Sequence, residues 1–128
     1  MKMAETKEQS ILVVDDNPDD RRVFRRMLES AGYCVVEGSS GREALAIVEK
    51  TRFALMTLDL SMPDMDGFDV LRSVRSRQPE LKIVVVSGFL HGKMLEPAKS
   101  LGADATLDKN LAATVLVPLV CNLLKNTK

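Results

Sequence analysis

Short apolar runs rich in β-branched residues alternate along this chain with longer segments whose apolar positions repeat every three or four residues. The runs at 11–14, 33–36, 53–58, 83–86 and 105–107 predict strands, and the segments between them predict helices. Strands that are apolar on both faces are typical of a parallel sheet covered by helices on both sides. The pattern therefore predicts an α/β fold built from repeated β-α units with right-handed crossovers.

Capping residues set the limits of the predicted helices. Pro18 fits the first position of a helix, Gly32 fits its end, and residues 40–43 form a capping box. Pro97 predicts that the fourth helix starts nearby and ends at Gly102. Inward-facing positions are predicted for Val23, Phe24, Met27, Leu28, Ala31, Ala44, Leu45, Val48, Phe68, Leu71 and Val74.

Polar residues stand where the predicted strands end. In chain order they are Asp15 and Asp16, Asp59, Ser87 and Lys109. Taken singly, the aspartate pair fits a helix start, the serine a turn and the lysine a solvated charge. Because ligand sites in such sheets lie beyond the carboxyl ends of the strands, we expect these side chains to converge on one site.

Three carboxylates at one place repel one another, and a hard divalent cation compensates their charge. We therefore predict a Mg²⁺ (or Mn²⁺) site that is held by Asp16 and Asp59. Asp15 is expected to bind the ion directly or through water, and the carbonyl of Ser61 to supply a further oxygen. An aspartate is also a covalent nucleophile toward phosphorus, and a metal, Lys109 and Ser87 would stabilise charge on phosphoryl oxygens.

Four sequence features carry a resemblance to a known family. They are ILVVDDN at 11–17, DLSMPDMDG at 59–67, IVVVSG at 83–88, and Lys109. Over 11–124 the chain resembles bacterial response-regulator receiver domains. The resemblance implies a flavodoxin-like fold, a doubly wound five-stranded parallel sheet of order 2-1-3-4-5 with helices on both faces.

The resemblance also implies a role for each strand-end residue. Asp59 matches the phosphoacceptor, Asp15 and Asp16 the acidic metal pair, Ser87 the switch residue, and Lys109 the lysine that contacts the phosphoryl group. The implied function is that of a two-component phosphorelay protein. It would take a phosphoryl group from a histidine kinase or phosphotransfer protein and switch the binding of a downstream partner. It would be a regulatory protein that catalyses its own phosphorylation and slow dephosphorylation, and no conventional enzyme.

Three positions depart from the family pattern or modify it. Asn110 replaces the usual proline after the lysine, so we expect a trans bond and a rearranged fifth loop. Thr106 replaces the usual switch aromatic, and Phe89 is a bulky group where the family tunes phosphate lifetime. The first two support an alternative, a degenerate receiver that binds partners without phosphorylation. A Mg²⁺-dependent phosphohydrolase is disfavoured, because Ser61 stands where such enzymes have a second aspartate.

Length and composition narrow the setting. With 128 residues the chain fits one domain: an expected ragged leader at 1–9, the receiver domain at 10–125 and a tail at 126–128. Whether it is a stand-alone protein or part of a longer one stays open. A formal net charge of +0 gives no general attraction to nucleic acid. Without an apolar run long enough for a membrane or a signal core, a cytoplasmic protein is expected.

Other residues have simpler expected roles. Cys34 and Cys121 are expected to be buried reduced thiols, and His91 to be structural or exposed. The arginines at 21–26 are expected to form a solvated helix face that suits a partner kinase, and Met62 and Met65 to pack in a loop. The last predicted helix, which Pro118 is expected to kink, has a surplus of apolar residues that suggests a homodimer or partner contact: Val115, Leu116, Leu119, Val120, Leu123 and Leu124.

Overall fold

The computed structural model describes residues 9–60, 62, 65–88 and 95–125. Strands and helices alternate along the chain. Their order is β1 (Ser10–Val14), α1 (Pro18–Ser30), β2 (Cys34–Gly38), α2 (Gly41–Lys50), β3 (Leu55–Asp59), α3 (Gly67–Arg77), β4 (Lys82–Ser87), α4 (Leu95–Ser100), β5 (Ala105–Asp108), the short 3₁₀ helix η2 (Lys109–Leu111) and α5 (Ala112–Lys125). The predicted β-α alternation is confirmed, with strand limits shifted by one or two residues.

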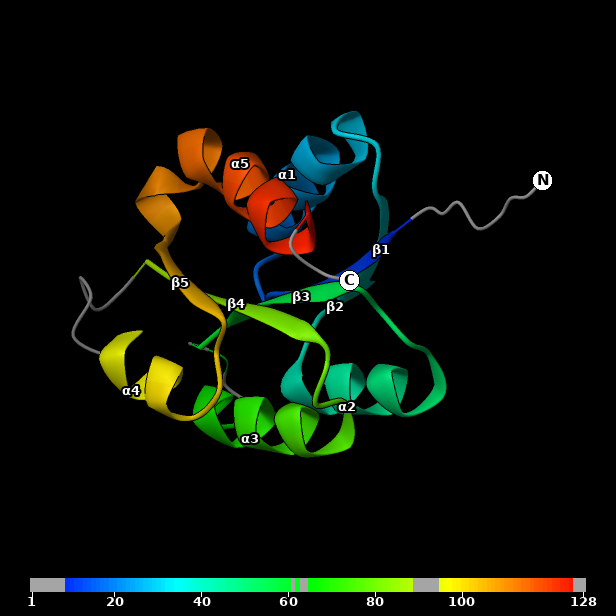
Figure 1. Ribbon diagram of the computed structural model, residues 1–128, viewed down its shortest axis with the longest axis vertical. Helices are drawn as coiled ribbons and strands as arrows, with labels where there is room; N and C mark the ends of the chain where they lie inside the picture. Colours follow the sequence, from blue (N-terminus) through cyan, green and yellow to red (C-terminus); the bar gives the residue numbers. More distant parts are fainter. Residues whose placement is uncertain (1–8, 61, 63–64, 89–94, 126–128) are drawn as a thin grey trace.

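The strands form one parallel sheet of order β2-β1-β3-β4-β5, as the resemblance implied. Helices α1 and α5 cover one face of this sheet, and α2, α3 and α4 cover the other (Figure 1). Each face has its own apolar core. Ile11, Leu28 and Leu116 belong to the core on the α1/α5 side, and Leu12, Leu71 and Met62 to the core on the other side. The doubly wound α/β fold is therefore confirmed, and Met62 packs as predicted.

Local hydrogen bonds explain why the helices begin and end where they do. The side chain of Asn17 accepts hydrogen bonds from the backbone N–H groups of Asp19 and Asp20, and Pro18 follows at the first helical position. Ser40 caps α2 by accepting from the N–H of Glu43, whose carboxylate accepts in turn from Ser39. The capping box is thus present, with its return bond one residue earlier than expected.

The predicted apolar stripe of α1 is partly wrong. Phe24 and Leu28 are buried, but Val23 is 53% exposed and Ala31 is exposed. Ala31 is the C-cap, where helical periodicity ends, and Gly32 follows with a positive φ of 101°. Val23 precedes Phe24 by one position, which turns its side chain about 100° away from the sheet.

The predicted burial of the two cysteines is also wrong, since both are free but exposed. Cys34 lies on β2, the edge strand, and alternates with the partly buried Val35. Cys121 follows the buried Val120 on α5 and therefore lies beside the buried stripe. Its sulfur accepts a hydrogen bond of 3.2 Å from the hydroxyl of Tyr33.

The surplus of apolar residues on α5 is largely used inside the fold. Leu116, Val120 and Leu124 are buried, while Val115, Leu119 and Leu123 are partly buried against the same core. A homodimer through this helix stays a prediction. Within the described residues, no helix combines the length and the apolarity that crossing a membrane requires.

Candidate functional site

The strand register brings the predicted site residues to one edge of the sheet. Val14 of β1 is paired with Leu58 of β3, so Asp15 and Asp59 follow at the same level on adjacent strands. Asp59 is paired in turn with Val86 of β4, which places Ser87 one residue further on. Parallel strands thus deliver these side chains to a common edge, as the strand-end rule predicts.

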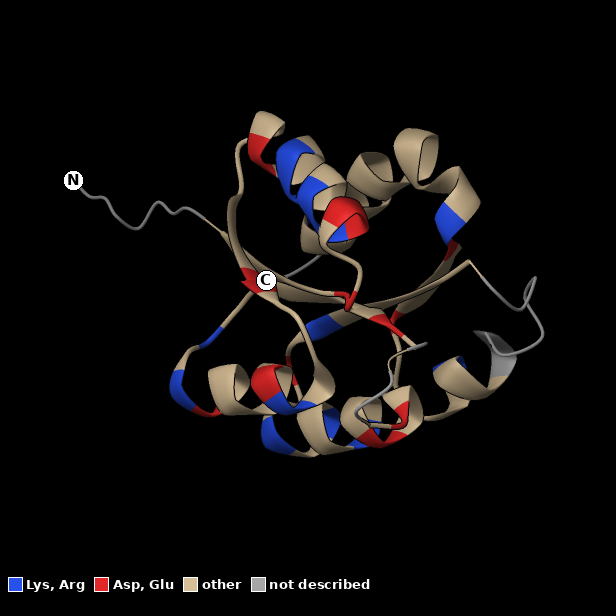
Figure 2. Cartoon of the chain, turned by 180° about the vertical axis from the view of Figure 1, so that it is seen from behind, with Lys and Arg blue, Asp and Glu red and all other residues tan. Residues whose placement is uncertain are grey.

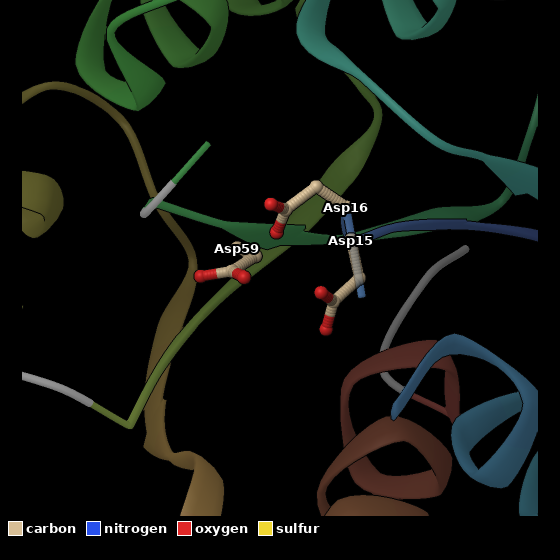
Figure 3. Close-up of side chains that lie close together, drawn as sticks. All are labelled: Asp15, Asp16 and Asp59. Carbon is tan, nitrogen blue, oxygen red and sulfur yellow. The ribbon is translucent and has the colours of Figure 1, made fainter. Parts of the chain in front are cut away.

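Three carboxylates gather at the ends of β1 and β3. Oxygens from Asp15, Asp16 and Asp59 all lie within 4.8 Å of one another. Asp15 and Asp59 are buried, at 2% and 5% exposure, whereas Asp16 is exposed. Figure 3 shows the side chains of Asp15 and Asp16 leaving the chain in different directions beside Asp59. Buried carboxylates at this spacing need a compensating cation.

Lys109 supplies positive charge to this cluster from the loop after β5. Its ammonium nitrogen lies 2.7 Å from Asp15 Oδ2 and 3.3 Å from Asp59 Oδ2. It lies 3.0 Å from Asp20 Oδ2. Burial by itself would lower the pKa of Lys109, but hydrogen bonds to Asp15 and Asp20 and the charge of Asp59 raise that pKa above its usual range. These carboxylates therefore favour the charged form of the lysine at the site.

The fifth loop reaches this arrangement without a proline. The carboxylate of Asp108 accepts a hydrogen bond of 2.9 Å from the N–H of Asn110 and starts the η2 turn. No peptide bond in the described part of the chain is cis, which confirms the expected trans bond at Asn110. Gly88 leaves room for Lys109, because a β-carbon at Gly88 would lie 3.1 Å from Lys109 Cβ.

A second group of charges lies behind the site on the α1 side. Arg21 donates to the backbone carbonyl of Asp15 at 2.8 Å and to the carboxylate of Glu37 at 2.7 Å. Arg25 binds the other oxygen of Glu37 at 2.8 Å. Hydrogen bonds from Arg25 and Arg21 lower the pKa of Glu37 below its usual range. Figure 2 shows acidic and basic positions along α1, but Arg21 is half-buried and fixed, so the predicted solvated face is wrong for this residue.

The structure brings together most, but not all, of the predicted set. Asp15, Asp16, Asp59 and Lys109 form one cluster, and the buried Ser87 ends the neighbouring strand. Ser61, Phe89 and His91 lie outside the described residues. Sequence reasoning missed Asp20. Its position in the sequence could have indicated a role at this site, because the first turn of α1 closely follows the acidic end of β1.

The residues fit a divalent cation. Oxygen ligands from carboxylates suit Mg²⁺, which typically takes one or two carboxylates and keeps several waters. Asp15, Asp16 and Asp59 offer such oxygens, and Asp16 is open to solvent for the waters of the ion. Lys109 alone leaves this cluster with an excess of negative charge, which a cation would remove.

The fold and this edge of the sheet define a flavodoxin-like α/β domain with an acidic site. The family model "Response regulator receiver domain" matches residues 11–120, and the chain belongs to this family. Receiver domains are regulatory phosphoacceptors of two-component systems. The family assignment of the sequence is therefore confirmed.

Individual proteins show the same likeness. The chain is 35% identical over 107 residues to the sensor protein EvgS of Escherichia coli, a match that covers 84% of this chain but only 9% of that protein. A CheY-like receiver domain from Methanospirillum hungatei has a TM-score of 0.89 at 27% identity, covering 94% and 97% of the two chains. The response regulator TrrA of Thermotoga maritima, solved in complex with Mg²⁺-BeF, has a TM-score of 0.81 at 28% identity, covering 90% and 98%.

Proposed function

We propose that this protein is the phosphoacceptor of a two-component phosphorelay, which takes a phosphoryl group onto Asp59 in a Mg²⁺-dependent reaction. The observation that carries this proposal is the contact of one lysine with two buried aspartates at the edge of the sheet. A receiver that had lost its chemistry would have no need of this costly arrangement of buried charge. The phosphorylation-independent alternative is therefore not favoured.

The proposed reaction is a transfer between two anions. A carboxylate oxygen of Asp59 forms a bond to phosphorus, while the bond from phosphorus to the nitrogen of a donor histidine breaks. The electron pair of the broken bond stays with the donor. Because attacking and transferred groups are both negative, the reaction depends on positive charge that is already in place.

The residues of the site would share this task. Asp15, Asp16 and Asp59 would hold Mg²⁺, which supplies positive charge to the phosphoryl oxygens when it is bound. Lys109 would turn its ammonium to another phosphoryl oxygen, since it already lies 3.3 Å from Asp59. Ser87, buried at the end of β4, would donate its hydroxyl to a third oxygen after a small movement. We also retain the carbonyl of Ser61 as a proposed metal ligand.

The partners follow from the chemistry. A histidine kinase or phosphotransfer protein would supply the phosphoryl group, and the similar segment of a sensor protein supports such a partner. Phosphorylation would shift the conformation that binds a downstream protein. Thr106, half-buried on β5, cannot make the ring movement of the usual aromatic, so the signal would pass through Ser87 and the β4 end. The proposal implies a cytoplasmic location, where such kinases act.

The test is the intact mass of the protein after incubation with acetyl phosphate and Mg²⁺. The unaltered protein should gain one phosphoryl group, and D59A should gain none. A matched control is D69A, which removes an exposed aspartate paired with Arg72 on α3 and should still be labelled. Chelation of Mg²⁺ should abolish labelling of the unaltered protein and of D69A.

Labelling of D59A, or labelling that persists without divalent metal, would contradict the proposed acceptor or the proposed metal dependence. No adduct on the unaltered protein, together with no binding of Mg²⁺-beryllofluoride, would contradict the phosphorelay function as a whole. The beryllofluoride arm excludes the possibility that a short-lived adduct is merely lost before the measurement.

A further inference from the structure

The ammonium of Lys109 has a third partner that the proposed reaction does not use. An ammonium has three N–H donors, and carboxylates of Asp15, Asp20 and Asp59 lie at 2.7, 3.0 and 3.3 Å from it. Asp15 and Asp59 have tasks as metal ligand and phosphoacceptor. Asp20 contributes no oxygen to the cluster of three carboxylates, so its contact to the lysine requires a separate explanation.

The three contacts are unequal. The distance to Asp59 is the longest, so the lysine lies closer to the α1 side of the site than to the acceptor. A phosphoryl group on Asp59 brings new oxygens that require a donor from Lys109. The phosphoryl group replaces the Asp59 carboxylate as a partner of Lys109, and the lysine must move away from Asp15 or Asp20 to reach it.

Burial decides which contact yields. The side chain of Asp15 is only 3% exposed, so losing the lysine would leave a buried charge whose compensation depends on the metal alone. The side chain of Asp20 is 42% exposed, in the first turn of α1, where water can replace the ammonium at little cost. The bond from Lys109 to Asp20 is therefore the one most easily exchanged for a phosphoryl oxygen.

We propose that Asp20 is a positioning residue that holds Lys109 on the α1 side of the unphosphorylated site and competes with the phosphoryl group for this lysine. This inference rests on the proposed phosphoacceptor function and adds a regulatory element to it. Asp20 sets how strongly the site resists phosphorylation. A carboxylate at this position lowers the occupancy of the phosphorylated form, and an uncharged side chain raises it.

The chain offers a matched control in the neighbouring residue. The side chain of Asp19 is 87% exposed and is paired with Arg22 at 3.2 Å. D19N removes the same charge from the same helical turn as D20N, without removing a partner of Lys109. Any effect through the helix dipole or the overall charge should therefore appear equally in both variants.

The measurement is the affinity of the intact protein for beryllofluoride at fixed Mg²⁺, followed by the ¹⁹F NMR signal of the bound fluorides. D20N should bind roughly threefold to tenfold more tightly, the range expected for loss of one charged hydrogen bond. D19N should change the affinity less than about twofold. D20E, which keeps the carboxylate, should bind like the unaltered protein. In a K109M background, D20N should have no further effect.

Four results would overturn the inference. Weaker binding by D20N would make Asp20 an anchor that orients the lysine toward the phosphoryl group. Equal tightening in D19N, or tightening that persists in K109M, would reduce the effect to general electrostatics. Unchanged binding in D20N would show that Asp20 does not compete with the phosphoryl group for Lys109. These results presuppose that the unaltered protein binds beryllofluoride, and failure of that binding would contradict the proposed function itself.

Discussion

Two cations of this fold, Lys109 and Arg75, are surrounded by protein oxygens, and the kind of oxygen differs. Arg75 of α3 donates to the carbonyls of Gly102, Pro79 and Leu81 at 2.6 to 2.8 Å, and to the carboxylate of Asp104 at 2.8 Å. These partners belong to loops that precede β4 and β5. Arg75 therefore ties the amino ends of two strands to α3, at the end of the sheet opposite the acidic site.

The two clusters have different physical consequences. Arg75 has a rigid planar fork whose donors match fixed carbonyls, and the carbonyls do not repel one another strongly. Lys109 is a compact charge with rotatable donors among three carboxylates that do repel one another. The first arrangement is stable in one geometry, whereas the second can be changed by one added or removed charge.

Removing the charge of Lys109 should chiefly affect the phosphorylation reaction. In K109M the phosphorylation rate with acetyl phosphate and Mg²⁺ should fall by about 100-fold or more, because a charge that stabilises the transferring group is lost. Intact mass against time measures this rate. K50M, which removes a lysine at the exposed end of α2, is the control and should react at the normal rate. A K109M protein that reacts as fast as the control would contradict the role of Lys109.

Removing the side chain of Arg75 should chiefly affect the stability of the fold. R75A loses hydrogen bonds to three carbonyls and one carboxylate, so the free energy of unfolding should fall by about 2–3 kcal/mol. Urea denaturation measures it. R72A breaks an exposed pair with Asp69 and should cost about 0.3 kcal/mol. The yield of phosphorylated protein per folded molecule should be normal in R75A, and a loss like that of K109M would remove the distinction between the two cations.

A smaller effect on stability is expected at Glu37. Its carboxylate pairs with Arg21 and Arg25, and like Arg75 it has a structural role. Because hydrogen bonds from Arg25 and Arg21 lower the pKa of Glu37, its stabilising contribution is present above the usual pKa of 4.5 and is lost as pH falls through the lowered value. E37Q should thus be less stable than the unaltered protein by about 0.5 kcal/mol near neutral pH. The difference should shrink when denaturation is repeated below the lowered pKa, and a difference that grows on acidification would contradict this account.

The sequence predicted the cluster around Lys109 better than the cluster around Arg75. Asp15, Asp59, Ser87 and Lys109 stand at strand ends, and parallel topology alone brings such positions together. The sequence patterns indicated no partner for Arg75. Its real partners are loop carbonyls far away in sequence, such as Gly102, and no periodicity indicates where loops will lie.

The misplaced residues have similar causes. Burial of Cys34 was predicted from an apolar run, but β2 is an edge strand and leaves alternate side chains exposed. The predicted strand order contained this information, because it already placed the second strand at the edge. Asp20 was missed because its contact with Lys109 joins residues that are 89 positions apart in the sequence. Sequence patterns predict single helices and strands, whereas these contacts and exposures depend on how the helices and strands pack against one another.

The most direct test compares the two cations in one sample. The ¹⁵N NMR signals of the Lys109 ammonium and the Arg75 side-chain Nε are recorded before and after addition of beryllofluoride with Mg²⁺, and are assigned with K109M and R75A. The account predicts that the Lys109 signal shifts as its partners change, while the Arg75 signal stays in place. A Lys109 signal that does not move when beryllofluoride binds, or shifts of equal size at both cations, would contradict it.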